Sequence, residues 1–92
     1  MRLGRLKIYY SGHVQGVGFR YLTSSLATGY DVIGTVGNLA DGRVELVVEG
    51  EAAELEAFRL AIRESELRGH IRNEQVFKSE ASGEFRGFQI IA

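Results

Sequence analysis

A glycine-rich segment at residues 12–20 ends in an arginine, and this combination can bind an oxyanion. Gly16 and Gly18 permit a positive φ, so successive backbone N–H groups can converge on one point. A helix that begins at Phe19 adds N–H groups without intrahelical partners and the positive end of its dipole. Arg20, in the first turn of that helix, can donate to two oxygens of the same ligand. Because an arginine at a helix N-terminus is otherwise unfavourable, the pattern predicts a bound anion here.

The glycine-rich segment also admits a structural interpretation, because turns between a strand and a helix are often rich in glycine. Two well-known phosphate-binding motifs do not fit it. A Walker A loop requires Gly-Lys-Ser/Thr after its second glycine, and the sequence contains no such triplet. A dinucleotide-binding fingerprint requires a third glycine three residues after Gly18, where Tyr21 stands. These residues alone leave both an anion-binding loop and an ordinary turn open.

The periodicity of apolar residues predicts the elements that position this segment. Five stretches have patterns typical of strands: 6–11, 31–38, 43–49, 70–80 and 85–91. Spacings of three and four predict two amphipathic helices, one from Phe19 to a stop at Gly29 and one over 51–67. The order β-α-β-β-α-β with a short C-terminal strand predicts an α+β, ferredoxin-like sandwich, in which two helices cover one face of an antiparallel sheet. We expect residues 1–92 to form one domain.

This topology brings two distant segments together. The first strand ends, and the first helix begins, at the same end of the sheet as the turn after the second strand. That turn, residues 38–42, contains Asp41-Gly42, a pair typical of tight hairpins. The glycine-rich segment and Asn38 are therefore expected to be neighbours in the folded chain.

Two stretches of the sequence resemble the signatures of the acylphosphatase family. Residues 14–20, Val-Gln-Gly-Val-Gly-Phe-Arg, are similar to the first signature, and residues 34–45 are similar to the second. The interval between Arg20 and Asn38 also has the length found in the family, and the resemblance extends from about residue 6 to residue 91. The family has the β-α-β-β-α-β fold predicted above. It hydrolyses the carboxyl–phosphate bond of acyl phosphates to a carboxylate and inorganic phosphate, without a metal or an organic cofactor.

The resemblance also implies roles for individual residues. Arg20 supplies the cationic group and Asn38 orients the water that attacks phosphorus, so these two residues are the expected catalytic pair. Backbone N–H groups of the loop, together with Arg20, bind the phosphoryl oxygens. The loop residues in this role are Gln15, Gly16, Val17, Gly18 and Phe19. The expected substrate is a small-molecule acyl phosphate, and no metal or cofactor is expected.

Two positions near Asn38 depart from the family pattern. Thr35 stands where the family usually has Trp, and Gly37 stands where it usually has Arg or Lys, which removes a positive charge from the rim of the site. These departures keep an alternative open: a non-catalytic or weakly catalytic module that binds phosphate or carbamoyl phosphate on the same fold. Acylphosphatase-like domains of this kind occur at the start of the carbamoyltransferases that mature nickel–iron hydrogenases. The short chain favours the hydrolase.

Composition narrows the remaining classes of function. The 11 basic and 12 acidic residues give a net charge of −1, so the chain lacks the broad basic surface that nucleic-acid binding requires. Cysteine is absent, which removes thiol nucleophiles, iron–sulfur clusters and disulfides, and two histidines make a poor metal site. No apolar run is long enough for a signal peptide or a membrane span. We therefore expect a cytoplasmic monomer that binds neither nucleic acid nor membrane.

Overall fold

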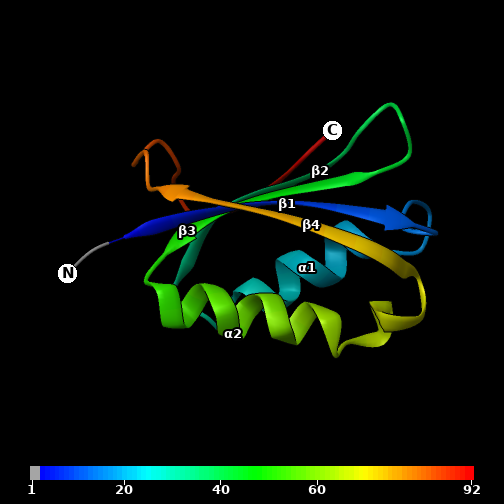
Figure 1. Ribbon diagram of the computed structural model, residues 1–92, viewed down its shortest axis with the longest axis horizontal. Coiled ribbons are helices and arrows are strands. Elements are labelled where there is room, and N and C mark those ends of the chain that lie inside the picture. Colours follow the sequence, from blue (N-terminus) through cyan, green and yellow to red (C-terminus); the bar gives the residue numbers. More distant parts are fainter. Residues whose placement is uncertain (1–2) are drawn as a thin grey trace.

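The computed structural model describes residues 3–92 and consists of a five-stranded sheet with helices on one face (Figure 1). The strands are β1 (Gly4–Gly12), β2 (Val32–Asn38), β3 (Val44–Gly50), β4 (Ile71–Glu80) and β5 (Phe88–Ile91). The helices are α1 (Phe19–Ala27), α2 (Ala52–Arg63) and a short 3₁₀ helix, η1 (Glu66–Gly69). Neighbouring strands follow the order β4-β1-β3-β2-β5. The ferredoxin-like α+β fold predicted from the sequence is confirmed.

Alternation along the strands separates a buried face from an open one. In β1, Leu6, Ile8 and Tyr10 point toward the helices and are buried, while the residues between them lie on the opposite face. The same layer contains Val32 and Val36 of β2, Val44, Leu46 and Val48 of β3, and Phe19, Leu55, Phe58 and Ile62 of the helices. Burial of this layer holds both helices against the sheet and fixes the strand register. Within residues 3–92, no helix is both long and apolar enough to cross a membrane.

The second helix is shorter than its apolar spacing predicted. The expected helix over 51–67 ends at Arg63, and η1 then follows as a separate turn. The Ser65 hydroxyl starts this turn by accepting a hydrogen bond from the Leu67 amide at 3.1 Å. The turn buries Leu67 in the core. The sequence pattern therefore continued past Arg63, although Leu67 does not belong to α2.

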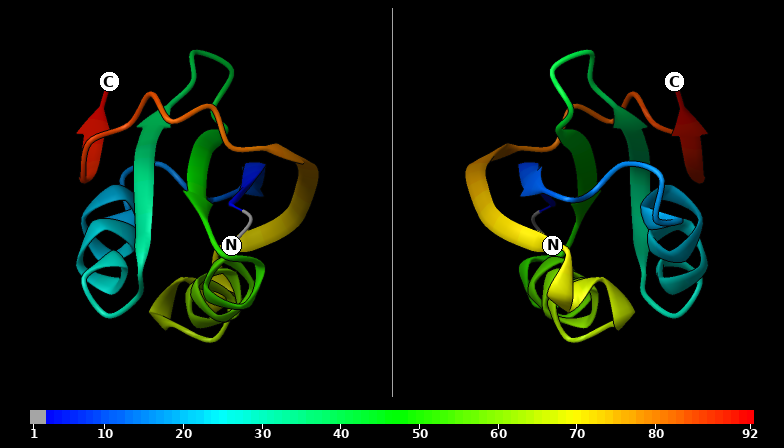
Figure 2. Two further views of the ribbon diagram at one scale, coloured as in Figure 1. Left: turned by 90° about the vertical axis from the view of Figure 1, so that its left-hand side faces the viewer. Right: turned by 90° about the vertical axis from the view of Figure 1, so that its right-hand side faces the viewer.

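The C-terminal strand makes the sheet mixed. Strands β1 to β4 pair antiparallel, as expected, whereas β5 lies parallel to β2, with Gly34 opposite Phe88 and Gly37 opposite Ile91. The segment 81–87 crosses the sheet from β4 at one edge to β5 at the other (Figure 2). The chain therefore returns antiparallel to β4, which is the direction of β2. The strand begins at Phe88, three residues later than predicted.

A buried glutamate fastens this crossing segment. Glu49 of β3 lies on the face away from the helices, yet only 2% of it is exposed. Its carboxylate accepts hydrogen bonds from Arg5 Nε at 2.8 Å, from the Ser82 amide and hydroxyl at 2.8 and 3.0 Å, and from the Gly83 amide at 3.1 Å. Four donors on one carboxylate satisfy its acceptor sites and tie 81–87 to the sheet.

Loss of this carboxylate should weaken the fold in a pH-dependent way. Burial opposes ionisation of Glu49, but the hydrogen bonds from Ser82, Arg5 and Gly83 outweigh it and hold the pKa of Glu49 below its usual value. The stabilisation is therefore present above the ordinary glutamate pKa and is lost as the pH falls through the lower folded-state pKa. Glu49→Gln should lower the free energy of unfolding at pH 7 by about 1–3 kcal/mol. Urea denaturation should show that the difference in unfolding free energy between the parent chain and Glu49→Gln becomes smaller below about pH 4.

Glu45→Gln is the matched control for this measurement. Glu45 lies on the same strand and the same face as Glu49, but it is only partly buried and carries no bond to the crossing segment. Equal unfolding free energies for the two variants would contradict the role assigned to Glu49.

Candidate active site

The glycine-rich loop leads into α1 with the backbone geometry that an anion site needs. Gly16 and Gly18 have φ of +79° and +80°. Gly18 is also the N-cap of α1, so no side chain caps the helix, and its first turn contains no acidic residue. Within the described part of the chain, no amide from Gln15 to Tyr21 donates a hydrogen bond to another protein group. These donors and the helix dipole are therefore available to an anionic ligand.

Gln15 ties the loop to the hairpin that follows β2. Its side-chain Nε2 donates to the carbonyl oxygens of Leu39 and Arg43, at 2.9 and 3.0 Å. The hairpin is itself closed by a 2.8 Å hydrogen bond from the Leu39 amide to the Arg43 carbonyl. One side chain thus fixes the loop beside Asn38, which is the neighbour of Leu39. Sequence reasoning assigned only the backbone of Gln15 and missed this role, because no local pattern distinguishes it from any polar loop residue.

Arg20 lies in the first turn of α1, with its guanidinium near the end of β5. Its Nη1 donates to the carbonyl oxygen of Ala92 at 2.7 Å, in an exposed position. Among residues 3–92, no other acceptor contacts the guanidinium. Because an arginine has five N–H donors, most of them stay available to a ligand while this bond limits the movement of the side chain.

Asn38 is the last residue of β2 and lies on the face that carries Val36, which is the face toward the helices. Its Oδ1 is buried and has no hydrogen-bond partner within residues 3–92. A buried amide oxygen without a partner costs about 1–3 kcal/mol, and only a few such atoms occur in a native structure. The structure therefore brings an unpaired acceptor to the sheet end at which Gln15 holds the loop.

Thr35 and Gly37, the two departures from the family pattern, belong to β2 and lie beside β5. A Cβ atom on Gly37 would stand 2.4 Å from the carbonyl oxygen of Ile91 and 2.9 Å from its Cγ1, so the backbone of β5 occupies the space of a side chain. Thr35 is opposite Gln89 in the same pairing. Sequence reasoning treated Gly37 as a lost charge. The structure adds that its missing side chain permits the close approach of β5.

The histidines and acidic residues do not form a metal centre in the region that the structure describes. No group of three His, Asp or Glu side chains there is placed to hold a metal ion. The His13 and His70 rings lie 6.0 Å apart, and the His13 amide donates to the His70 carbonyl at 2.9 Å. This bond anchors the start of the glycine-rich loop to the turn before β4, so His13 has a structural part in holding the loop.

Comparison with known proteins extends the local match to the whole chain. A model of the acylphosphatase family matches residues 6–90. An acylphosphatase of Paenarthrobacter aurescens is 45% identical, over 95% of this chain and 93% of its own length. A crystal structure of Bacillus subtilis acylphosphatase superposes with a TM-score of 0.88 at 31% identity, covering 97% of this chain and 99% of that one. Full-length HypF, solved in a phosphate- and nucleotide-bound form, matches 99% of this chain with 12% of its length, at a TM-score of 0.85 and 31% identity. By sequence and by fold, this chain belongs to the acylphosphatase family.

Proposed function

We propose that the chain hydrolyses the carboxyl–phosphate bond of acyl phosphates at the loop of residues 15–20. The family match and the identity with acylphosphatases over nearly their full lengths support the reaction. One observation supports the proposal for the site: Gln15 ties the loop, whose amides have no partner within residues 3–92, to the hairpin next to Asn38. Amides and a guanidinium suit a tetrahedral dianion.

The loop and Arg20 bind the phosphoryl group. The backbone amides from Gln15 to Arg20 donate to its oxygens. The guanidinium N–H groups of Arg20 that do not bind Ala92 donate to them as well. Phosphoryl transfer asks a protein mainly for positioning and for stabilisation of charge on these oxygens. The αL glycines set the amides before the substrate arrives, so the site needs little reorganisation during the reaction.

Asn38 holds the attacking water in line with the bond that breaks. The Oδ1 atom accepts a hydrogen bond from the water, which directs the water oxygen at phosphorus. A new P–O bond forms, the bond between phosphorus and the acyl oxygen breaks, and the water proton passes to a phosphoryl oxygen. The leaving carboxylate is weakly basic, with a pKa of about 4, so it departs as an anion without a general acid.

The direct test is release of both products from benzoyl phosphate or acetyl phosphate. The purified chain should produce carboxylate and inorganic phosphate in equal amounts, at a rate proportional to its concentration and unchanged by EDTA. Phosphate release measured by colorimetry and carboxylate release by chromatography check the stoichiometry. Absence of turnover above the spontaneous rate, at any substrate concentration tested, would contradict the proposal.

A second function rests on the match to HypF. That protein was solved with phosphate bound, and the region similar to this chain is 12% of its length. A module of this kind would bind phosphate or carbamoyl phosphate without efficient hydrolysis. Tight phosphate binding in a calorimetric titration, together with no turnover of any acyl phosphate, would select this function over the first.

We infer further that the chain acts as a single-domain monomer in the cytoplasm. Every group assigned to the site comes from one copy of the chain, and the sequence has no cysteine for which an oxidising compartment would be required. Sedimentation analysis should give a single species of about the 10.2 kDa chain mass.

A further inference from the structure

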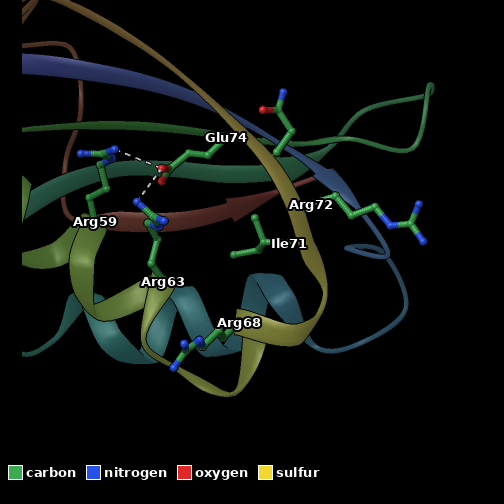
Figure 3. A pocket seen from close by; sticks show the side chains of 7 residues that line it. Arg59, Arg63, Arg68, Ile71, Arg72 and Glu74 are labelled. Carbon is green, nitrogen blue, oxygen red and sulfur yellow. Dashed lines mark hydrogen bonds and ion pairs between the residues drawn. The ribbon is translucent and has the colours of Figure 1, made fainter.

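A second basic site lies far along the chain from the glycine-rich loop. A pocket of about 440 Å³ opens between the C-terminal end of α2, η1 and the start of β4 (Figure 3). None of its residues belongs to the loop or to the hairpin after β2. The residues that line it are Arg59, Arg63, Arg68, Ile71, Arg72, Asn73 and Glu74.

Positive charge exceeds negative charge inside this pocket. Four arginines line it, from three different elements, against the single carboxylate of Glu74. That carboxylate accepts from Arg59 Nη2 at 3.1 Å and lies 3.8 Å from Arg63 Nη1. Arg59 also bonds Glu56 at 3.0 Å through Nη1, while its buried Nε has no partner within residues 3–92. Arg63 is held only loosely.

The outer arginines have no protein partner. Within residues 3–92, no acceptor contacts Arg68 or Arg72. Both lie at the rim of the pocket, and Arg72 points away from the other three arginines (Figure 3). Glu64 and Glu66 lie in the same turn but are exposed and do not line the pocket. Arg63, Arg68 and Arg72 thus keep N–H donors for a ligand. This local positive charge contrasts with the net charge of −1 of the chain.

The fold holds these like charges together at a cost. Arg59 and Arg63 are four residues apart on α2, a spacing at which like charges repel. The negative end of the α2 dipole offsets Arg63, which lies in the last turn of that helix. No helix end offsets Arg72, which lies in β4. A bound polyanion would remove the repulsion among Arg63, Arg68 and Arg72.

We propose that this pocket binds a compound with two or more linked phosphate groups. Guanidiniums match phosphate oxygens in pairs, and several of them spread over one pocket suit several linked phosphates better than one. Arg63 and Arg68 donate to the phosphates, and Arg72 rotates inward from the rim to add a third guanidinium. Glu74 keeps Arg59 and Arg63 in place from the floor. The basic surface is confined to the pocket, which favours a small oligophosphate over a nucleic-acid strand.

The experiment titrates inorganic tripolyphosphate into the full chain carrying Arg20→Ala, which weakens the anion site of the proposed hydrolase. Calorimetry at low salt should show saturable binding to one site. Adding Arg63→Gln and Arg72→Gln should weaken it by about tenfold or more, because two charge-assisted contacts are lost. The same two substitutions in the otherwise unaltered chain should leave acyl phosphate hydrolysis unchanged.

Arg86→Gln is the control for Arg63→Gln and Arg72→Gln made singly, because Arg86 is exposed in the crossing segment and each of the three substitutions removes one positive charge. Its effect on tripolyphosphate affinity should stay within about twofold. Adenosine triphosphate that binds as tightly as tripolyphosphate, or more tightly, would support the site and indicate a nucleotide. No saturable binding, an equal loss in the Arg86 control, or tighter binding of a single-stranded oligonucleotide would overturn the proposal.

Discussion

Replacing Arg20 by alanine should reduce acyl phosphate hydrolysis by on the order of 10³–10⁵-fold, the range that a transition-state arginine contributes in other phosphoryl transfers. Among residues 3–92, the guanidinium is the only side-chain cation assigned to the proposed site, and the amides around it carry only partial charges. Its loss therefore removes both substrate affinity and stabilisation of the phosphoryl oxygens as charge builds on them. Steady-state kinetics with benzoyl phosphate should show kcat/KM falling more than kcat.

Two further variants make this result specific. Arg20→Lys keeps the charge but cannot donate to two oxygens at once, so it should recover only part of the lost activity. Arg86→Ala removes an exposed arginine from the crossing segment and should leave the kinetics unchanged. An Arg20→Ala enzyme with nearly full activity would show that the phosphoryl group binds elsewhere.

Replacing Asn38 by alanine should slow turnover by on the order of 10²–10³-fold, the effect of deleting one preorganised polar group from an active site. The substitution removes the group that aims the water, while the loop and Arg20 still bind phosphate. KM and inhibition by inorganic phosphate should therefore change little. The comparison to make is kcat with benzoyl phosphate for the two proteins under saturating substrate.

The stability of this variant tests the same assignment independently. Within the described residues the buried Oδ1 of Asn38 has no partner, so its removal costs that part of the fold no hydrogen bond. Asn38→Ala should unfold at a urea concentration equal to or above that of the parent chain, which is the behaviour of a residue kept for function. Asn73→Ala, on β4, provides a control that should change neither turnover nor stability. Unaltered kcat in the Asn38 variant would exclude the water-orienting role.

The features that sequence could predict are those set by neighbouring residues. Period-two and period-three-to-four patterns located the strands and both long helices, because burial of one face produces them directly. Gly16 and Gly18 adopt the positive φ that their residue type permits. The neighbourhood of the loop and Asn38 followed from topology alone. The catalytic roles of Arg20 and Asn38, and the binding roles of the loop amides, stay predictions that the kinetics above will test.

The features that sequence could not predict depend on long-range contacts. An alternating strand places Glu49 on the open face, which predicts exposure, yet the segment 81–87 covers it. The Gln15 amide reaches two carbonyls more than twenty residues away. The parallel pairing of β5 depends on the path of a proline-free connection, residues 81–87, across the sheet. All three features depend on segments that are distant in the sequence and come together only in the folded chain.

The pairing of β5 with β2 also bears on how copies of this protein avoid one another. A strand at the border of a sheet exposes N–H and C=O groups that can capture another chain and start aggregation. Here β2 is covered, and the border strand on that side is only four residues long. The opposite border, β4, is ten residues long but carries charged side chains at Arg72, Lys78 and Glu80. The short border strand on one side and the charged one on the other both oppose strand addition, so we expect concentrated protein to form no intermolecular sheet.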